Sequence, residues 1–207
     1  DEVAHALAYW AARWQPVPVV AASGQRRAAE VVDGIPAIPD QRFGIRFRLR
    51  QLGDTPGFAA SAAQVARPTQ ADAVPAALAQ VVDAAVAAYP RLAHGNATML
   101  VHAATAPNAV LMALPSLPEG LWLDSYDAAW TATAAVVAAY RPSEPAPQPT
   151  VGAAPRSVDA STDAWGRAVS NGGEHIVKLA DTALLAVERT GDPVGLAAID
   201  TAIRLDA

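Results

Sequence analysis

The residues best suited to chemistry lie near the C-terminal end of this chain, in the segment Glu174-His175-Ile176-Val177-Lys178. A glycine pair precedes the segment, and its pattern predicts a helix over residues 174–190. His175 and Lys178 are three residues apart, so a helix places both side chains on one face. The rest of that face is apolar and consists of Leu179, Thr182 and Leu185. Burying a lysine cation without a partner is costly. Lys178 therefore either reaches solvent or meets an interior group that requires it.

Spacing alone favours an ion pair for Lys178. Glu174 precedes it by four residues and Asp181 follows it by three, and both positions are within contact distance on a helix. This interpretation needs no catalytic role for the lysine.

A second candidate segment surrounds His102: Val101-His102-Ala103-Ala104-Thr105-Ala106-Pro107-Asn108-Ala109-Val110. Its small neighbours leave room for a substrate or a metal near the imidazole. Thr105 can hydrogen-bond the ring or a ligand, and we expect Pro107 to interrupt the helix and free carbonyl groups there. A core histidine bonded to a backbone carbonyl explains this pattern equally well.

The remaining sequence offers few catalytic alternatives. There is no glycine-rich phosphate loop, dinucleotide fingerprint, Gly-x-Ser-x-Gly or HExxH motif. His5 fits a helix surface, and His94 fits a loop or the start of a helix. The five tryptophans are expected mainly in the core, although aromatic walls suit a planar substrate.

Composition narrows the class of protein. The chain has 207 residues, of which 52% are hydrophobic and 17% charged, so it can bury a large core. A net charge of −5 argues against a nucleic-acid partner, as does the scatter of the basic residues, which cluster only in Arg46-Phe47-Arg48-Leu49-Arg50. There is no cysteine, which fits a cytoplasmic location. No run of 18 uninterrupted apolar residues and no signal sequence is visible, so we expect no membrane association.

The hydrophobic pattern predicts an all-α fold, a helical bundle in one domain over residues 1–207. Residues 45–50 alternate apolar and basic side chains, which fits an edge strand, an extended arm or a helical turn. Five prolines in residues 142–156 predict a surface linker, and residues 157–162 resemble a second one. The helices are expected at residues 1–14, 55–65 with Thr55 as the N-cap, 70–89 ending at Pro90, 94–114, 124–140, 174–190 and 193–205. Between the last two, Thr190-Gly191-Asp192-Pro193 supplies the stop of one helix and the cap and first-position proline of the next.

Two of these segments together resemble the questin oxidase family. The His102 segment, running on to Leu114-Pro115-Ser116-Leu117-Pro118, resembles the family's "HxxTxPxAxxxLLPxLP" segment. The stretch Glu174-His175-Ile176-Val177-Lys178-Leu179-Ala180-Asp181-Thr182-Ala183 resembles its C-terminal "(D/E)EHxIKxxxxA" segment. Residues 2–13 resemble a mid-protein helix of bacterial members, and residues 53–58 fit between them. The resemblance covers most of the chain, but the two histidine segments carry its specificity.

The resemblance implies a helical non-haem iron oxygenase that uses O2 to cleave an aromatic polyketide such as an anthraquinone. It further implies that Fe(II) is held by histidines and by a lysine carboxylated on its amine. Carried over to this sequence, the ligands are His102, His175 and a carboxylated Lys178. A carbamate anion beside a divalent cation is a satisfied buried charge. Imidazole and carboxylate-type oxygen ligands suit Fe(II) with open positions for O2.

Three further residues receive roles from their positions beside these ligands. Thr105 and Asn108 are candidates for contacting the substrate or supporting the ligands. Glu174 is placed to orient His175 or to bridge to Lys178. These three complete the set of candidate catalytic residues.

The chain departs from the family in one respect. Full-length members carry further histidines in an N-terminal region that this sequence lacks, so we expect the C-terminal part of a larger helical domain. An upstream segment or a second chain would then complete the metal site. One alternative is a Baeyer–Villiger monooxygenase that uses flavin or NADPH. The absence of a dinucleotide fingerprint argues against this alternative. Another is a non-catalytic helical binding protein that lacks a complete metal site.

Overall fold

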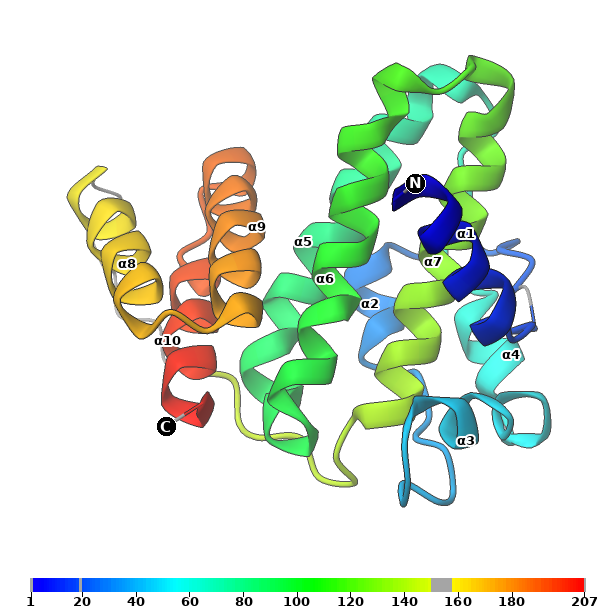
Figure 1. Ribbon diagram of the computed structural model, residues 1–207, viewed down its shortest axis with the longest axis horizontal. Coiled ribbons are helices and arrows are strands. Elements are labelled where there is room, and N and C mark those ends of the chain that lie inside the picture. The colour runs from blue at the N-terminus through cyan, green and yellow to red at the C-terminus, as the bar shows by residue number, and fades with distance from the viewer. Residues whose placement is uncertain (1, 19, 150–157, 207) are drawn as a thin grey trace.

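The computed structural model describes residues 2–18, 20–149 and 158–206, and they form helices joined by loops (Figure 1). This described part contains no β-strand, only two isolated bridges between residues 24–26 and 65–66. The predicted all-α fold is therefore confirmed. The principal helices are α1 (Glu2–Arg13), α2 (Ala28–Val32), α3 (Ile45–Leu49), α4 (Phe58–Ala62), α5 (Val74–Leu92), α6 (Ala97–Ala113), α7 (Trp122–Tyr140), α8 (Val158–Asn171), α9 (Glu174–Thr190) and α10 (Val194–Asp206).

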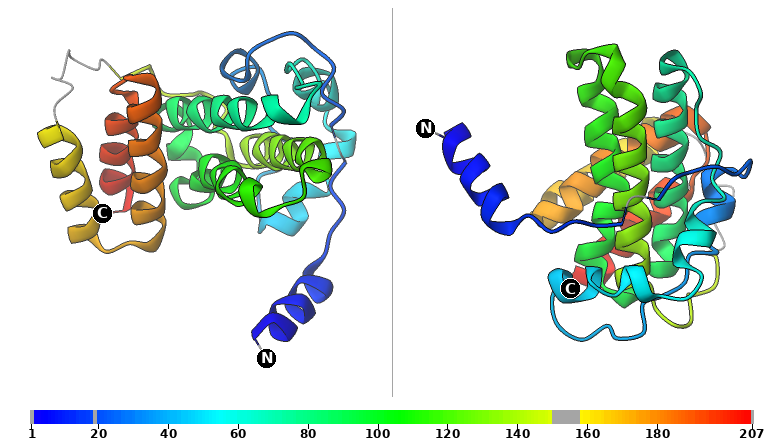
Figure 2. Two further views of the ribbon diagram at one scale, coloured as in Figure 1. Left: turned by 90° about the horizontal axis from the view of Figure 1, so that it is seen from above. Right: turned by 90° about the vertical axis from the view of Figure 1, so that its right-hand side faces the viewer.

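Two groups of helices make up the body of the molecule. Helices α5, α6 and α7 form a central layer, α9 and α10 pack against its α5–α6 side, and α8 packs outside them (Figure 1). The short helices α2 and α4 cover the layer elsewhere, and single turns of 3-10 helix join several elements. Helix α1 contains no buried residue and projects from the body in both views of Figure 2.

Helix α6 is continuous through Pro107, so the predicted interruption is wrong. A proline has no N–H to donate to the carbonyl four residues before it, which here is Ala103. The buried Thr133 hydroxyl of α7 donates to that carbonyl at 3.1 Å. A neighbouring helix thus satisfies the freed carbonyl, and α6 continues as one helix through Pro107.

Other predicted boundaries also shift. Helix α5 continues two residues past Pro90, where the sequence predicted its end. Thr55 is not an N-cap: its hydroxyl donates to the Gln51 carbonyl at 2.8 Å, and α4 covers only Phe58–Ala62. Residues 158–162 belong to α8 rather than to a second linker.

The turn between α9 and α10 matches its prediction. Gly191 ends α9 with a φ of 67°, a left-handed conformation that glycine adopts readily. The Asp192 carboxylate accepts a hydrogen bond from the Val194 amide at 2.9 Å and so caps α10. Gly195 then lets the helices approach closely, since a Cβ there would lie 2.7 Å from the Ala183 carbonyl oxygen.

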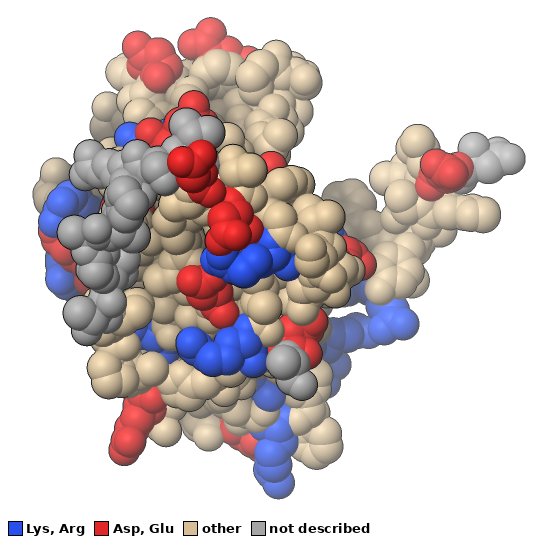
Figure 3. All heavy atoms as spheres, turned by 90° about the vertical axis from the view of Figure 1, so that its left-hand side faces the viewer, with Lys and Arg blue, Asp and Glu red and all other residues tan. Residues whose placement is uncertain are grey.

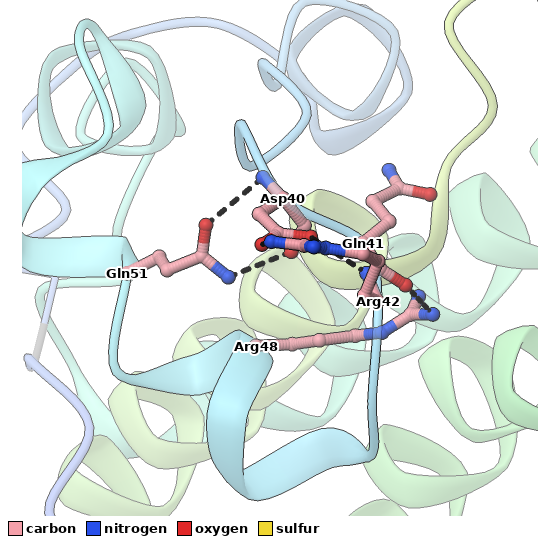
Figure 4. Close-up of polar contacts among 5 residues, drawn as sticks. All are labelled: Asp40, Gln41, Arg42, Arg48 and Gln51. Carbon is pink, nitrogen blue, oxygen red and sulfur yellow. Dashed lines mark hydrogen bonds and ion pairs between the residues drawn. The ribbon is translucent and has the colours of Figure 1, made fainter.

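Residues 45–49 form the helix α3, which corrects the strand interpretation and agrees with the helical-turn alternative. The Arg48 guanidinium lies 4.3 Å from the centre of the Tyr140 ring and donates to the Ala139 carbonyl, which fixes α3 on α7. Arg48 also donates to the Gln41 carbonyl, and Gln51 bonds both backbone groups of Asp40 (Figure 4). Side chains of α3 and its C-terminal turn thus hold the preceding loop.

The core is rich in alanine and valine, with one large aromatic centre. Trp130 is fully buried and its indole donates to the Ala62 carbonyl at 3.0 Å, while Tyr126 donates to the Ala66 carbonyl. Trp10, Trp14 and Trp165 are 59%, 61% and 38% exposed. The expectation that tryptophans lie mainly in the core therefore fails for three of the five.

Two helical stretches, residues 71–95 and 97–116, are long and apolar enough to cross a membrane by length and composition. They contain α5 and α6, and the core helices of a globular protein pass the same test. Both helices pack against several others in this fold.

The proline-rich segment follows α7. Residues 142–149 contain no helix, and the Ala146 amide donates to the Arg91 carbonyl at 2.9 Å. The rest of the predicted linker, residues 150–156, lies outside the described residues.

Candidate functional site

Helices α6 and α9 lie side by side and bring His102 and His175 together (Figure 1). The ring centres are 5.1 Å apart and the ring planes meet at 89°. Both residues are half-buried. The two segments that sequence analysis singled out therefore meet in one place.

The separation of the rings is compatible with a shared metal ion. Two imidazoles bound to one ion at neighbouring positions, with metal–nitrogen distances of about 2.1 Å, have ring centres about 5 Å apart. The same distance is ordinary for an edge-to-face pair of aromatic rings. No hydrogen bond joins either imidazole to another residue that the structure describes. In its neutral form each ring has one nitrogen with a lone pair, and no described residue hydrogen-bonds it.

Lys178 lies at the surface, with 49% of its side chain exposed, and its amine pairs with the Glu174 carboxylate. This is the ion pair that spacing predicted, with Glu174 rather than Asp181 as the partner. The hydrogen bond and charge of Lys178 lower the pKa of Glu174. As an amine engaged by a carboxylate, Lys178 donates hydrogen bonds and offers no electron pair to a metal.

The ligand set is incomplete within the described residues. No group of three or more histidine, aspartate, glutamate or cysteine side chains there could hold a metal ion. His102 and His175 thus fit two positions of a metal shell. A third ligand requires either a modified Lys178 or a group from outside the described chain.

The three candidate catalytic residues occupy different environments. Thr105 is half-buried, and its hydroxyl donates to the Val101 carbonyl of its own helix at 3.2 Å. Asn108 is only 4% exposed. Glu174 is exposed and paired with Lys178, with no hydrogen bond to His175. Its proposed role of orienting His175 is therefore absent from this arrangement, while its bridge to Lys178 is present.

Asn108 links the two helices of the site. Its amide nitrogen lies 3.3 Å from the Thr182 hydroxyl of α9, which accepts its hydrogen bond, and 3.7 Å from the Met112 sulfur. Its carbonyl oxygen Oδ1 is buried and has no hydrogen-bond partner among the described residues. Such atoms are uncommon because burial without a partner is costly. A ligand or water that donates a hydrogen bond would satisfy it.

Sequence reasoning missed Thr182, which it grouped with the apolar face of α9. Thr182 is 2% exposed and bonds Asn108 across the interface. Its position seven residues after His175, two helical turns along the same face, could have identified it.

Electrostatics favours the neutral form of His102. Partial burial lowers its pKa, and the nearby His175 and Lys178 lower it further, against an opposing effect of Glu174. A neutral imidazole carries the lone pair that metal binding requires.

The other two histidines lie away from this pair. His5 is exposed on α1, and His94 is exposed with Nε2 3.1 Å from the Glu144 carbonyl oxygen. Both positions agree with the surface locations expected from the sequence.

The α8–α10 group carries mixed charges rather than one sign (Figure 3). Arg167 of α8 pairs with Asp163 and with Asp200 of α10, and Arg189 of α9 pairs with Asp83 of α5. The first of these ion pairs lies within α8, and the other two join neighbouring helices; none of the three lies between α6 and α9.

Comparisons with known proteins match no family model, no curated protein and no solved structure. The resemblance to the questin oxidase family stays a prediction that rests on the two histidine segments.

Proposed function

We propose that this chain forms part of a non-haem iron oxygenase that cleaves a ring of a planar aromatic polyketide, such as an anthraquinone. The observation that carries the proposal is the His102–His175 pair, with ring centres 5.1 Å apart across α6 and α9. The two segments that supply these histidines are the two that resemble the questin oxidase family.

Each residue has a defined task in this proposal. His102 and His175 supply imidazole ligands, and Lys178 supplies an oxygen ligand after carboxylation of its amine. Its flexible four-carbon stem and partial exposure allow it to leave Glu174 and turn toward the imidazoles. An upstream segment or a second chain supplies the remaining ligands. Iron in this site would activate O2 for attack on a ring carbon beside a carbonyl.

Thr105 and Asn108 lie one and two helical turns along α6 from His102. The unpaired Asn108 oxygen is suited to accept a hydrogen bond from a substrate hydroxyl. The Thr105 hydroxyl bonds its own helix but can also accept a hydrogen bond from a ligand.

Metal analysis tests the proposal. We expect the purified protein to bind Fe(II) and to lose most of it in His102→Ala and His175→Ala. His94→Ala is the matched control, because His94 is exposed and lies away from the pair. Lys178→Ala should weaken iron binding, and intact-mass analysis should detect carboxylation on Lys178. Iron content that is unchanged in both histidine variants would exclude the ligand assignment.

A second candidate is a helical binding protein without a metal. The Lys178–Glu174 ion pair favours it, because that pair satisfies the lysine without carboxylation. The two candidates differ under chelation. If the protein contains no iron and binds an aromatic quinone equally well with and without a chelator, the binding protein is favoured. If it consumes NADPH under the same conditions, the flavin- or NADPH-dependent monooxygenase is favoured.

A further inference from the structure

Three arginines line one open cleft beside α3. Arg13 from the end of α1 and Arg46 and Arg50 from the α3 region surround a volume of about 530 Å³, together with Gly44, Ile45 and Phe47. The lining contains no aspartate or glutamate. None of the three arginines forms an ion pair with a carboxylate in the described residues.

Several arginines elsewhere in the molecule are paired with carboxylates. Arg42, close to the cleft in sequence, is paired with Asp40 through three hydrogen bonds. Arg67 is paired with Asp127 in the same bidentate manner. In a chain with more acidic than basic residues, three neighbouring arginines without a carboxylate form an unusual local excess of positive charge.

A second cleft of about 440 Å³ adjoins the first and shares Arg46 and Arg50 with it. Trp14 and Gln15 contribute to its wall. The Gln15 amide nitrogen donates to the Arg46 carbonyl at 3.0 Å, which ties the segment after α1 to α3. The other end of that amide, Oε1, is buried and has no hydrogen-bond partner in the described part of the chain. This buried acceptor is independent of the arginines and requires a hydrogen-bond donor at the same place, from a ligand or from water.

We propose that the cleft of Arg13, Arg46 and Arg50 binds a phosphate-bearing anion that also carries a hydrogen-bond donor. Guanidinium groups bind phosphate oxygens bidentately, and three of them match a group with more than one negative charge better than a single carboxylate. Gln15 Oε1 accepts a hydrogen bond from a hydroxyl or amine of the ligand. Trp14 and Phe47 supply aromatic surface beside it.

This site is separate from the histidine pair. Helix α3 contacts α7, whereas α9 packs against α5 and α6. In Figure 1, α3 lies at the lower right by the end of α7, and α9 lies to the left of α5 and α6. The anion site therefore goes beyond the proposed function and does not depend on it.

Calorimetric titration with pyrophosphate tests the inference. We expect binding that weakens as salt is raised, because exposed charges are screened. The double variant Arg46→Gln/Arg50→Gln should lower the affinity by at least about tenfold, since hydrogen bonds to charged groups contribute more than this factor. Arg26→Gln/Arg27→Gln is the matched control: it removes the same charge from arginines that pair with Glu30. Equal affinity in the two double variants, or no binding by the wild type, would overturn the proposal.

Vesicles distinguish the two sources of such a phosphate. Sedimentation with phosphatidylglycerol vesicles and with neutral phosphatidylcholine vesicles should be run on the same variants. Binding to anionic vesicles that Arg46→Gln/Arg50→Gln abolishes identifies a lipid headgroup. Pyrophosphate binding without vesicle binding identifies a free phosphate compound.

Discussion

Helix α6 has two interfaces that differ in how they treat polar groups. Toward α7, the carbonyl that Pro107 frees on Ala103 receives the buried Thr133 hydroxyl. Toward α9, the Asn108 oxygen has no partner, and the imidazoles of His102 and His175 lie together without a hydrogen bond to any described residue. The α7 interface is complete by itself, and the α9 interface is not.

This difference indicates where a ligand belongs. Native proteins satisfy nearly all of their buried polar atoms, with exceptions concentrated at sites that bind water, ions or ligands. Both interfaces belong to one helix of similar small residues, so local sequence composition does not explain the contrast. The buried Asn108 oxygen that lacks a partner on the α9 side is one of the groups that the proposed site uses.

Thr133→Val, on the α7 side, should destabilise the protein more than the substitutions of Asn108 and Thr182 on the α9 side described below. It leaves the Ala103 carbonyl buried without a donor, because Pro107 cannot provide one. We expect a loss of about 1–3 kcal/mol in the free energy of unfolding, measured by urea denaturation.

Thr105→Val is the matched control on helix α6. The Thr105 hydroxyl donates to the Val101 carbonyl inside α6, so its removal should change stability by less than about 0.5 kcal/mol. Equal losses in the two variants would show that the α6–α7 interface does not depend on the Thr133 hydrogen bond.

The Asn108–Thr182 contact should behave as a coupled pair of intermediate effect. Asn108→Leu alone leaves the buried Thr182 hydroxyl without its hydrogen-bond partner. We expect it to lower the free energy of unfolding by about 1 kcal/mol, measured by urea denaturation. Adding Thr182→Val removes the second polar group and should recover most of that loss, since replacing both partners by apolar groups is nearly neutral. Additive losses would contradict this. If Asn108 contacts substrate, the double variant stays folded and loses substrate binding.

Much of the fold follows from the sequence because its determinants are local. The helix pair α9–α10 was predicted from Thr190-Gly191-Asp192-Pro193, where a left-handed glycine and an aspartate cap act within a few residues. The errors at Pro107 and Thr55 have non-local or competing causes. A threonine of α7 rescues the helix at Pro107, and the Gln51 carbonyl takes the Thr55 hydroxyl.

In the candidate site, too, the local features could be predicted from the sequence and the contacts between helices could not. The ion pair of Lys178 with Glu174 was predicted from helical spacing. The meeting of His102 with His175 could not come from spacing, because it depends on how α6 packs on α9; the resemblance alone suggested it. Thr182 was missed because a threonine among leucines fits an apolar face until its partner on another helix is known.

The smallest expected effect is a loss of stability at low pH, which His102 at the α9 interface should cause. Burial and the neighbouring His175 and Lys178 lower the folded-state pKa of His102 below its usual 6.5, with Glu174 opposing them. The unfolded chain then binds a proton more readily, so stability is intact above about pH 6.5 and falls as pH drops toward the lowered value. In chelator-treated protein, His102→Gln should flatten this decline, measured as the urea midpoint across that range. His94→Gln changes an exposed histidine outside the pair and should retain the wild-type decline. If the decline in stability persists unchanged in His102→Gln, groups other than His102 cause it.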